Sequence, residues 1–469
     1  MPSPNTSERR PSLLWRPEFP FRPSSLPFYY GWVVLAISTI GLVMSAPGQT
    51  IGVSVFTEAL LETTGLSRVQ FSNAYLMGTL ASGLLLPYAG SQLDRIGVRR
   101  FVVAASIGLA IVLALLSQVD RLADEVAKLG LSRITAAYAL LIIGFLGLRF
   151  TGQGALTLVS RTILGRWFDK KRGLVSSISA PFASVSFASS PLLLAGWVAH
   201  SGWRDAWQEM ALVIGLGMGF FGWLFFRESP EECDLPMDGI AASPAPLSIV
   251  LEERVEPKSA STPRAATPLA NAADPHDYTR KEAIRTAAFW LVTLAMSNHA
   301  LVGTGIALHI VDLAAESGLS EAEALRLFLP VTLLSVPTGI IMGLAVDRFP
   351  MRRLIMAMMV GQTLMFGLAP HLGNPVLYVL CLAGWGFSGG FYGPLTVAAL
   401  PNFFGRTHLG AIQGVMMMVL VIASALGPAL LALAKSSFGS YETGLHLLAL
   451  LPSVLFFVAL FMPDPKSRR

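Results

Sequence analysis

The sequence predicts an all-α membrane protein with twelve transmembrane helices in two pseudo-symmetric six-helix bundles. Three observations support this fold class. Only 13% of the 469 residues are charged, whereas soluble domains carry about 25%. Twelve apolar runs are long enough to cross a bilayer, which takes about 20 residues. A charged motif also occurs once in each half of the chain.

The apolar runs form two groups of six. In the first half they cover residues 28–57, 68–90, 99–119, 134–163, 173–199 and 206–227. In the second half they cover residues 286–312, 325–346, 352–370, 374–398, 410–434 and 442–462. We therefore expect a cytoplasmic N-terminal tail (1–27), a first bundle (28–227), a cytoplasmic linker (228–285), a second bundle (286–463) and a cytoplasmic C-terminal tail (464–469).

The tail and the linker have compositions unlike the runs. The tail is rich in Pro, Ser and Arg and lacks the apolar centre of a signal peptide. The linker is rich in Pro, Ala and Ser, which predicts a flexible segment with a short surface helix near its end.

The basic residues predict the orientation. With both termini inside, 26 of the 34 Lys and Arg residues fall in cytoplasmic segments and 7 fall in outer loops. Arg149 is the one basic residue that this topology places deep in a span. The asymmetry agrees with the positive-inside rule and predicts a multi-pass protein of the cell (cytoplasmic) membrane.

The repeated motif lies on the predicted cytoplasmic side of both halves. "GSQLDRIGVRR" (90–100) follows the second run and "GLAVDRFPMRR" (343–353) follows the eighth. A second pair, "LGRWFDKKRG" (164–173) and "LPNFFGRTHLG" (400–410), follows the fourth and tenth runs. The two bundles are therefore related copies in parallel orientation.

These features resemble the major facilitator superfamily. The first motif resembles the signature G-x-x-x-D-R-x-G-R-R, with Val98 where arginine is usual, and the second copy has Pro350 in place of the second glycine. The resemblance implies alternating access and a turn that ties helix ends together on the cytoplasmic side when the transporter is open outward. It implies gating roles for Gly90, Asp94, Arg95, Gly97, Arg99, Arg100, Asp347 and Arg348.

Other stretches resemble the bacterial monocarboxylate-porter and oxalate:formate-antiporter-like group. They are "YYGWVVL" (29–35), "GRWFDKKRG" (165–173), "RESPEECDLPMDG" (227–239), "EAIRTAAFW" (282–290) and "FFGRTHLGAIQG" (403–414). The resemblance implies secondary active transport of a small organic anion by proton symport or anion exchange. That group commonly carries basic residues at mid-membrane positions of the first, eighth or eleventh helix, and this sequence has none at those positions.

Arg149 is the first candidate binding residue. A buried arginine costs about 3 kcal/mol on insertion scales, so it must face the bundle interior and find a partner. Its guanidinium could contact a substrate carboxylate, serve the conformational cycle, or pack structurally. Gln153 lies on the same helix face, where it could extend a polar stripe into the pathway or form a hydrogen bond between helices.

The other candidates lie on three predicted helices. Asn298 and His299 are about 18 Å along their helix, so His299 could carry a coupling proton or stay neutral and hydrogen-bonded. Gln49 belongs to the segment 44–56, where Pro47 and Gly48 predict either a cavity wall or a plain kink. Trp385 and Tyr392 could shape a pocket.

Several function classes lack support in the sequence. There is no Walker A motif, no metal-ligand spacing and no nucleophile with an arranged base, so we expect neither an enzyme nor a cofactor. We expect a small-molecule substrate, the lipid bilayer and a coupling proton or counter-anion as partners, no nucleic acid, and a monomer. The alternatives are an exporter of a neutral or amphipathic compound on the same fold and a transport-inactive sensor.

Overall fold

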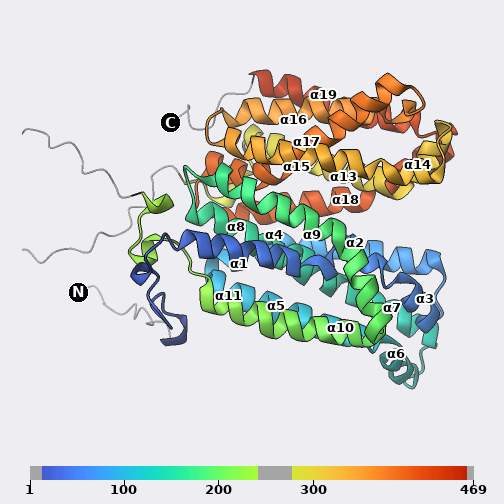
Figure 1. The fold of residues 1–469 in the computed structure, drawn as a ribbon. Coiled ribbons are helices and arrows are strands. Elements are labelled where there is room, and N and C mark those ends of the chain that lie inside the picture. Colours follow the sequence, from blue (N-terminus) through green and yellow to red (C-terminus); the bar gives the residue numbers. More distant parts are fainter. Residues whose placement is uncertain (1–12, 241–276, 462–469) are drawn as a thin grey trace, which may run out of the picture.

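The computed structural model describes residues 13–240 and 277–461, in which all regular elements are helices (Figure 1). The first bundle contains α1 (Gly31–Met44), η3 (Ala46–Gly48), α2 (Thr50–Ser54), α3 (Thr57–Thr64), α4 (Arg68–Ile96), α5 (Val98–Leu116), α6 (Val119–Ala127), α7 (Arg133–Leu148), η4 (Arg149–Leu156), α8 (Thr157–Trp167), α9 (Arg172–Ser201), α10 (Trp203–Leu212), η5 (Val213–Met218) and α11 (Gly219–Phe225). The second contains α13 (Ala287–Glu316), α14 (Glu321–Arg326), α15 (Phe328–Val346), α16 (Met351–Leu368), η8 (Ala369–His371), α17 (Pro375–Phe404), α18 (Leu409–Phe438) and α19 (Glu442–Phe461).

Each predicted run corresponds to one helix or to a continuous series of helices. Ten of these helical segments in the described chain are long and apolar enough to cross a membrane, and α9 makes eleven if its two arms form one span. Its arms bend by 42° near residue 188, where Pro191 removes the hydrogen bond to the residue four positions earlier. The remaining helix, α4, is 29 residues long, but residues in its central part such as Tyr75, Ser82, Pro87 and Tyr88 lower its hydropathy.

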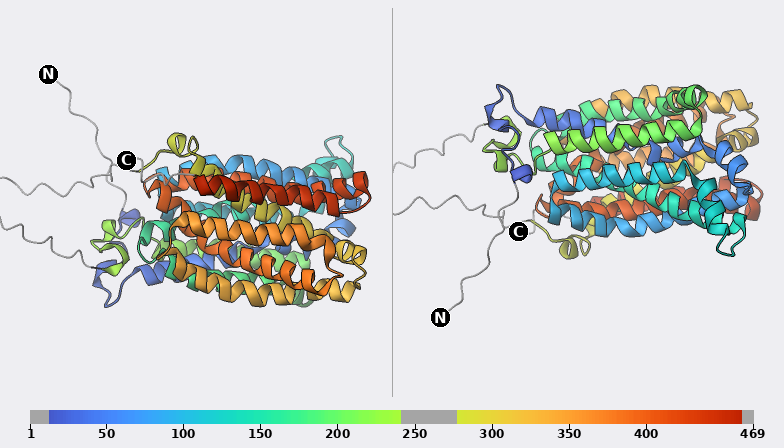
Figure 2. Two further views of the ribbon diagram at one scale, coloured as in Figure 1. Left: turned by 90° about the horizontal axis from the view of Figure 1, so that it is seen from above. Right: turned by 90° about the horizontal axis from the view of Figure 1, so that it is seen from below.

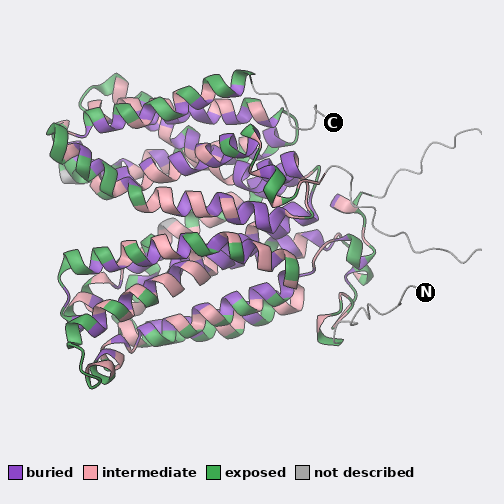
Figure 3. Cartoon of the chain, turned by 180° about the vertical axis from the view of Figure 1, so that it is seen from behind, coloured by how far each residue is buried: buried purple, intermediate pink, exposed green. Residues whose placement is uncertain are grey.

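Many residues on the outer faces of the bundles are exposed (Figure 3), and large apolar residues are among them. Leu192 is 79% exposed, Ile143 is 66% exposed and Leu84 is 63% exposed. A water-soluble protein rarely exposes such large apolar areas, whereas the hydrocarbon of a bilayer accommodates them without loss. The all-helical membrane fold predicted from the sequence is therefore confirmed.

The two bundles lie beside each other (Figure 1), and seen from above or below one bundle covers the other (Figure 2). Helix α4 packs against α18, and α9 packs against α15. We call the end that carries Gly97, Trp167, Asp347 and Phe404 the linker end, because residues 228–240 lie there, and the other end the opposite end. The described chain begins at the linker end, and α19, its last helix, runs toward the same end (Figure 1).

The described part of the linker differs in part from its prediction. The predicted short helix near its end is present as α12 (Arg280–Ala283), which begins at a capping box formed by Thr279 and Glu282. Residues 228–240, however, form η6 (Glu231–Cys233) and η7 (Met237–Gly239) and make side-chain contacts with both bundles. Flexibility is therefore the wrong description of residues 228–240. The rest of the predicted linker, 241–276, and the tail segments 1–12 and 464–469 lie outside the described residues.

The described part of the N-terminal tail also makes contacts. Arg99 donates to the carbonyl oxygens of Arg16 and Phe19 at 2.9 and 3.2 Å, and Arg227 donates to the carbonyl oxygen of Pro17 at 2.6 Å. Arg100 lies over the ring of Trp15. Arg99 and Arg100 therefore hold the tail against the first bundle rather than joining the two bundles.

Candidate functional site

A cavity of about 280 Å³ lies between the two bundles. The first bundle contributes residues of α1, η4, α8 and α9, and the second contributes residues of α15, α17 and α18. Most of the lining is small or apolar. The polar side chains with nitrogen or ring hydroxyl groups are those of Gln49, Gln153, Arg161 and Tyr392.

Two of these side chains are positioned by a close backbone approach. Pro47 lies in η3, so the first span is interrupted as its sequence predicts, and the chain turns before α2. Gly48 then approaches Gly152 so closely that a Cβ on Gly48 would lie 2.7 Å from the Gly152 Cα atom. Because η4 is a π-helical turn, a form often found at functional sites, Gln153 is placed beside Gln49 at the cavity wall.

Arg161 is the positively charged residue that lines this cavity. It lies in α8, and its guanidinium carbon is 5.8 Å from the centre of the Tyr392 ring, within the range of a cation–π contact. Arg161 is therefore a further arginine within the helices of the first bundle, and it lines the cavity, which Arg149 does not. Arg161 is six residues before the end of α8, about 9 Å along the helix axis, and its side chain reaches the space between the bundles.

Arg149 has a different environment from the one predicted for a pathway residue. Its side chain is buried, and it is not among the residues that line the cavity. Its Nη1 donates to the Gly48 carbonyl oxygen at 3.1 Å and to the Thr50 hydroxyl at 3.3 Å. The guanidinium also lies 5.4 Å from the centre of the Tyr75 ring. Arg149 thus bonds the carbonyl group that the interruption of α1 leaves free.

The two polar residues predicted on α13, Asn298 and His299, have different contacts. Asn298 is buried inside the second bundle and donates to Gln362 Oε1 at 3.1 Å. His299 contacts Ser388 through Nδ1 at 2.9 Å, and its ring centre is 5.2 Å from that of Tyr392. His299 therefore lies directly behind a cavity-lining ring, whereas Asn298 joins two helices.

Trp385, also predicted to shape a pocket, packs elsewhere. Its ring contacts Phe328 with a centre-to-centre distance of 5.7 Å, and it belongs to the apolar cluster toward the opposite end of the second bundle. Gln49, Gln153 and Tyr392 are thus the predicted binding residues that line the cavity, and Arg161 is the one that sequence reasoning missed.

The first charged turn joins the two bundles at the linker end. Asp94 accepts hydrogen bonds from the backbone N–H groups of Gly410 at 2.9 Å and Ala411 at 2.7 Å, at the start of α18. It also forms an ion pair with Arg166 at 2.6 Å. The two side chains are only 13% and 7% exposed. We call this contact the Asp94 clasp. A carboxylate at a helix N-terminus interacts favourably with the helix dipole and with the free N–H groups.

The second charged turn makes the reciprocal contact. Asp347 accepts hydrogen bonds from the backbone N–H groups of Gly173 at 2.8 Å and Leu174 at 3.1 Å, at the start of α9. We call this contact the Asp347 clasp. Each bundle therefore supplies one carboxylate to a helix start of the other bundle. Arg95 and Arg348, which follow these carboxylates, are exposed.

Glycines at equivalent positions allow the helices to come this close. A Cβ on Gly90 would lie 2.1 Å from the Gly410 carbonyl oxygen, and a Cβ on Gly343 would lie 2.6 Å from the Gly173 carbonyl oxygen. Gly90 and Gly343 are the first residues of the two repeated motifs. Gly97 has a different role, because its φ of +83° lets the chain pass from α4 to α5.

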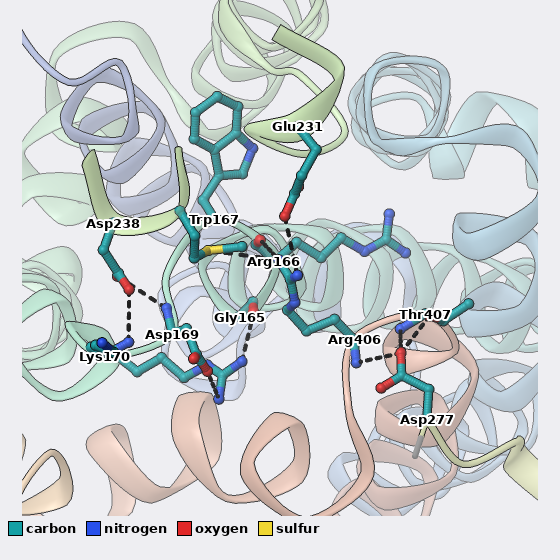
Figure 4. Close-up of polar contacts among 12 residues, drawn as sticks. Gly165, Arg166, Trp167, Asp169, Lys170, Glu231, Asp238, Asp277, Arg406 and Thr407 are labelled. Carbon is teal, nitrogen blue, oxygen red and sulfur yellow. Dashed lines mark hydrogen bonds and ion pairs between the residues drawn. The ribbon is translucent and has the colours of Figure 1, made fainter. Parts of the chain in front are cut away.

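Residues 228–240 reinforce the closed linker end (Figure 4). Glu228 pairs with Arg166 and accepts a hydrogen bond from the Val98 N–H at 2.7 Å. Glu231 accepts from Arg406 of the second bundle at 3.1 Å. Asp238 accepts from the backbone N–H groups of Asp169 and Lys170 at 3.0 and 2.8 Å.

The hydrogen bonds between the bundles share one location. In the described chain they involve Asp94, Asp347, Gln413, Arg280 and Arg406, which lie from the level of Thr162 to the linker end. The structure therefore shows the cavity closed from the linker end.

The comparisons with known proteins agree with this architecture. No curated protein sequence matches the chain. The E. coli fucose:proton symporter FucP has a similar structure, with a TM-score of 0.61 at 12% identity, covering 92% of this chain and 98% of that chain. The human organic anion transporter MFSD10 gives 0.58 at 16% identity, covering 91% and 98%. The proton:xylose symporter XylE gives 0.61 at 16% identity, covering 93% and 96%.

At these identities the solved structures establish the fold alone. The family assignment comes from the sequence itself, since the model of the Major Facilitator Superfamily matches residues 35–428, which is most of the chain. With two six-helix bundles, a cavity between them and reciprocal clasps at one end, the chain belongs to the Major Facilitator Superfamily and is a secondary transporter rather than an enzyme.

Proposed function

We propose that this transporter carries a small organic anion, of the monocarboxylate type, by alternating access. The observation that carries the proposal is the position of Arg161, whose side chain lines the cavity between the bundles. An arginine within a membrane span is costly and marks a functional contact by default. A substrate carboxylate would supply the negative charge that it needs.

The surroundings of Arg161 favour a ligand as its partner. The ion pairs among the described residues involve neighbouring arginines such as Arg166 and Arg172, but not Arg161. The Tyr392 ring contacts the guanidinium. A guanidinium can bind a carboxylate through two parallel hydrogen bonds, and this geometry distinguishes arginine from lysine.

The size of the cavity supports a small substrate. Pockets for drug-sized ligands range from about 300 to 1,000 Å³, and this cavity has about 280 Å³. The remaining polar groups, Gln49 and Gln153, offer hydrogen bonds from the first bundle to a carboxylate or hydroxyl group.

Proton symport is one of two proposed coupling modes. Two structural relatives are named as proton symporters, and His299 offers a titratable ring next to Tyr392 in this chain. Tyr392 also contacts Arg161, so this one ring connects His299 to the proposed anion contact. Exchange against a second anion needs no such group and is the other mode.

Uptake into proteoliposomes tests the proposal. We expect a panel of labelled monocarboxylates to include a substrate that enters wild-type vesicles and whose uptake falls at least about tenfold in Arg161→Gln and in Arg161→Lys, because lysine lacks the fork. Arg326→Gln is the matched control, since Arg326 is exposed at the opposite end. Equal uptake by wild type and Arg161→Gln would contradict anion binding by Arg161 and favour the neutral or amphipathic substrate.

We also propose that the linker end faces the cytoplasm of the cell and that the transporter works as a monomer. The excess of Lys and Arg at this end supports the orientation. Lys281 is exposed on α12, so Lys281→Cys can be labelled with a membrane-impermeant maleimide. Labelling only after the cells are permeabilised is expected, whereas labelling of intact cells would reverse the orientation.

A further inference from the structure

Three side chains able to bind a metal ion gather at the opposite end of the second bundle, away from the central cavity. His371 ends η8, Glu442 begins α19, and His446 follows Glu442 by four residues. One donor atom from each lies within 4.8 Å of the other two. We propose that His371, Glu442 and His446 bind a divalent transition-metal ion of the zinc class.

The donor set fits this class of ion. Two imidazoles and one carboxylate are typical ligands of Zn²⁺, whereas Ca²⁺ and Mg²⁺ require oxygen ligands. Glu442 and His446 are separated by one helical turn and so lie on the same face of α19. His371 comes from a separate segment of the chain, and its ring centre lies 5.7 Å from that of His446.

A hydrogen bond fixes how His446 would bind. Its Nε2 lies 3.1 Å from the carbonyl oxygen of Gly367. A carbonyl oxygen only accepts, so Nε2 carries the proton and Nδ1 keeps its lone pair. Metal-binding histidines characteristically donate their other ring N–H to a carbonyl or carboxylate, which orients the ring. His446 already has this second contact.

The geometry requires only a small adjustment. Ligand atoms about 2.0–2.2 Å from a tetrahedral zinc ion lie about 3.3–3.6 Å from one another, so the three donors must close by about 1 Å. Glu442 and His446 are exposed and His371 is half-buried. The long side chain of Glu442 can therefore move without displacing packed neighbours. Three protein ligands leave a fourth position for water.

The site would join two elements of one bundle. Gly367 belongs to α16, His371 follows it, and α16 packs against α19 (Figure 1). A bound ion would hold the end of α16 and η8 to the start of α19. It would not cross to the first bundle, so it would stabilise the second bundle without locking the two bundles together. This proposal is independent of the transported substrate.

Calorimetric titration of purified, tag-free protein with ZnCl₂ tests the site. Wild type should bind one equivalent. His371→Ala and His446→Ala should each weaken binding at least about tenfold, since loss of even a supporting contact has an effect of this size. His200→Ala is the matched control, because His200 is exposed near the same end of the molecule, at the end of α9, and it should bind as wild type does.

Two further measurements keep the proposal falsifiable if a variant folds poorly. Co²⁺ should give the visible absorption bands of tetrahedral nitrogen and oxygen ligation in wild type and lose them in Glu442→Gln. Zn²⁺ should raise the Tm of wild type by about 2 °C or more, and not that of Glu442→Gln. Stoichiometric binding that survives in all three variants, or no binding to wild type, would overturn the proposal.

Discussion

Replacing Asp94 by asparagine removes one negative charge from the linker end while keeping the size of the side chain. In the wild type the carboxylate accepts from two backbone N–H groups of α18 and pairs with Arg166. Asparagine keeps one acceptor oxygen, and its amide nitrogen would face donors. Arg166 retains Glu228 as a partner, so the variant does not leave a buried cation alone. We therefore expect a folded protein whose linker end opens more readily.

The size of the effect follows from the three contacts of the Asp94 carboxylate, each of which becomes weaker when the charge is removed. A hydrogen bond to a charged group contributes about 1.5–3 kcal/mol and a neutral one about 0.5–1.5 kcal/mol, so each of the three contacts loses about 1 kcal/mol. The sum of about 3 kcal/mol corresponds to a shift of about 150-fold in the ratio of open to closed molecules at the linker end.

Distances between spin labels at the linker end measure this ratio. Lys170 of the first bundle and Arg353 of the second are exposed and can carry the labels after substitution by cysteine. Native Cys233 and Cys381 are buried, and burial raises the pKa of Cys233 to about 12, so it reacts slowly. Asp94→Asn should add a population with a longer distance and slow transport.

Two comparisons sharpen this experiment. Asp347→Asn should have a smaller effect, because the described contacts of the Asp347 clasp are two backbone N–H groups without an arginine ion pair. Asp124→Asn, which removes an exposed ion pair with Arg133 at the opposite end, should leave the distances unchanged. An Asp94→Asn protein with wild-type distances, wild-type transport and wild-type Tm would refute the assignment of Asp94 to closure.

Other changes test other parts of the structure. Arg149→Lys should lose most transport in the uptake assay while the protein stays folded, because one ammonium cannot reproduce both the bonds to Gly48 and Thr50 and the contact with Tyr75; normal uptake would leave Arg149 with a packing role. Gly48→Ala should lower the free energy of unfolding by about 1–3 kcal/mol, because the added Cβ would meet the Gly152 backbone. Thermal unfolding measures this, and Gly130→Ala serves as a comparison, because a Cβ there has open space although the φ of Gly130 is positive. Hydrogen bonds from Arg204 lower the pKa of Asp120, so its contribution to stability is present above the unfolded pKa of about 4 and is lost as the pH falls through the lower folded pKa; Asp120→Asn should flatten the fall in Tm below about pH 4, and an unchanged profile would contradict the assignment.

The fold could be predicted because helix length and repetition are local properties of the sequence. The twelve runs appear as helical segments, and Pro47 and Gly48 interrupt the first span as predicted. The short helices α3, α6 and α14 between spans were not separated from the runs and loops around them. The contacts of residues 228–240 could not be predicted from composition, since they depend on Asp238 and Glu231 meeting groups far away in the sequence.

The site was harder to predict because the topology was assigned from charge. Arg161 lies near the end of a run that leads into the basic segment after α8, so its charge was counted with the cytoplasmic residues. Arg149, in contrast, stands alone between apolar stretches of the sequence. Which of the two faces the cavity depends on helix rotation and on the π-helical η4 between them, and neither can be read from the spacing of apolar residues alone.

The two clasps have a consequence for how the halves of the chain are related. In a twofold-symmetric dimer, an interface is self-complementary: a residue of one subunit contacts a second residue of its partner, and the converse contact is also made. Asp94 with Gly410 and Asp347 with Gly173 are such a pair of contacts within one polypeptide. The linker end is thus built as the interface of a dimer whose subunits have been fused. Moving the two bundles apart at the linker end would withdraw both carboxylates from both helix starts, so the two clasps would open together.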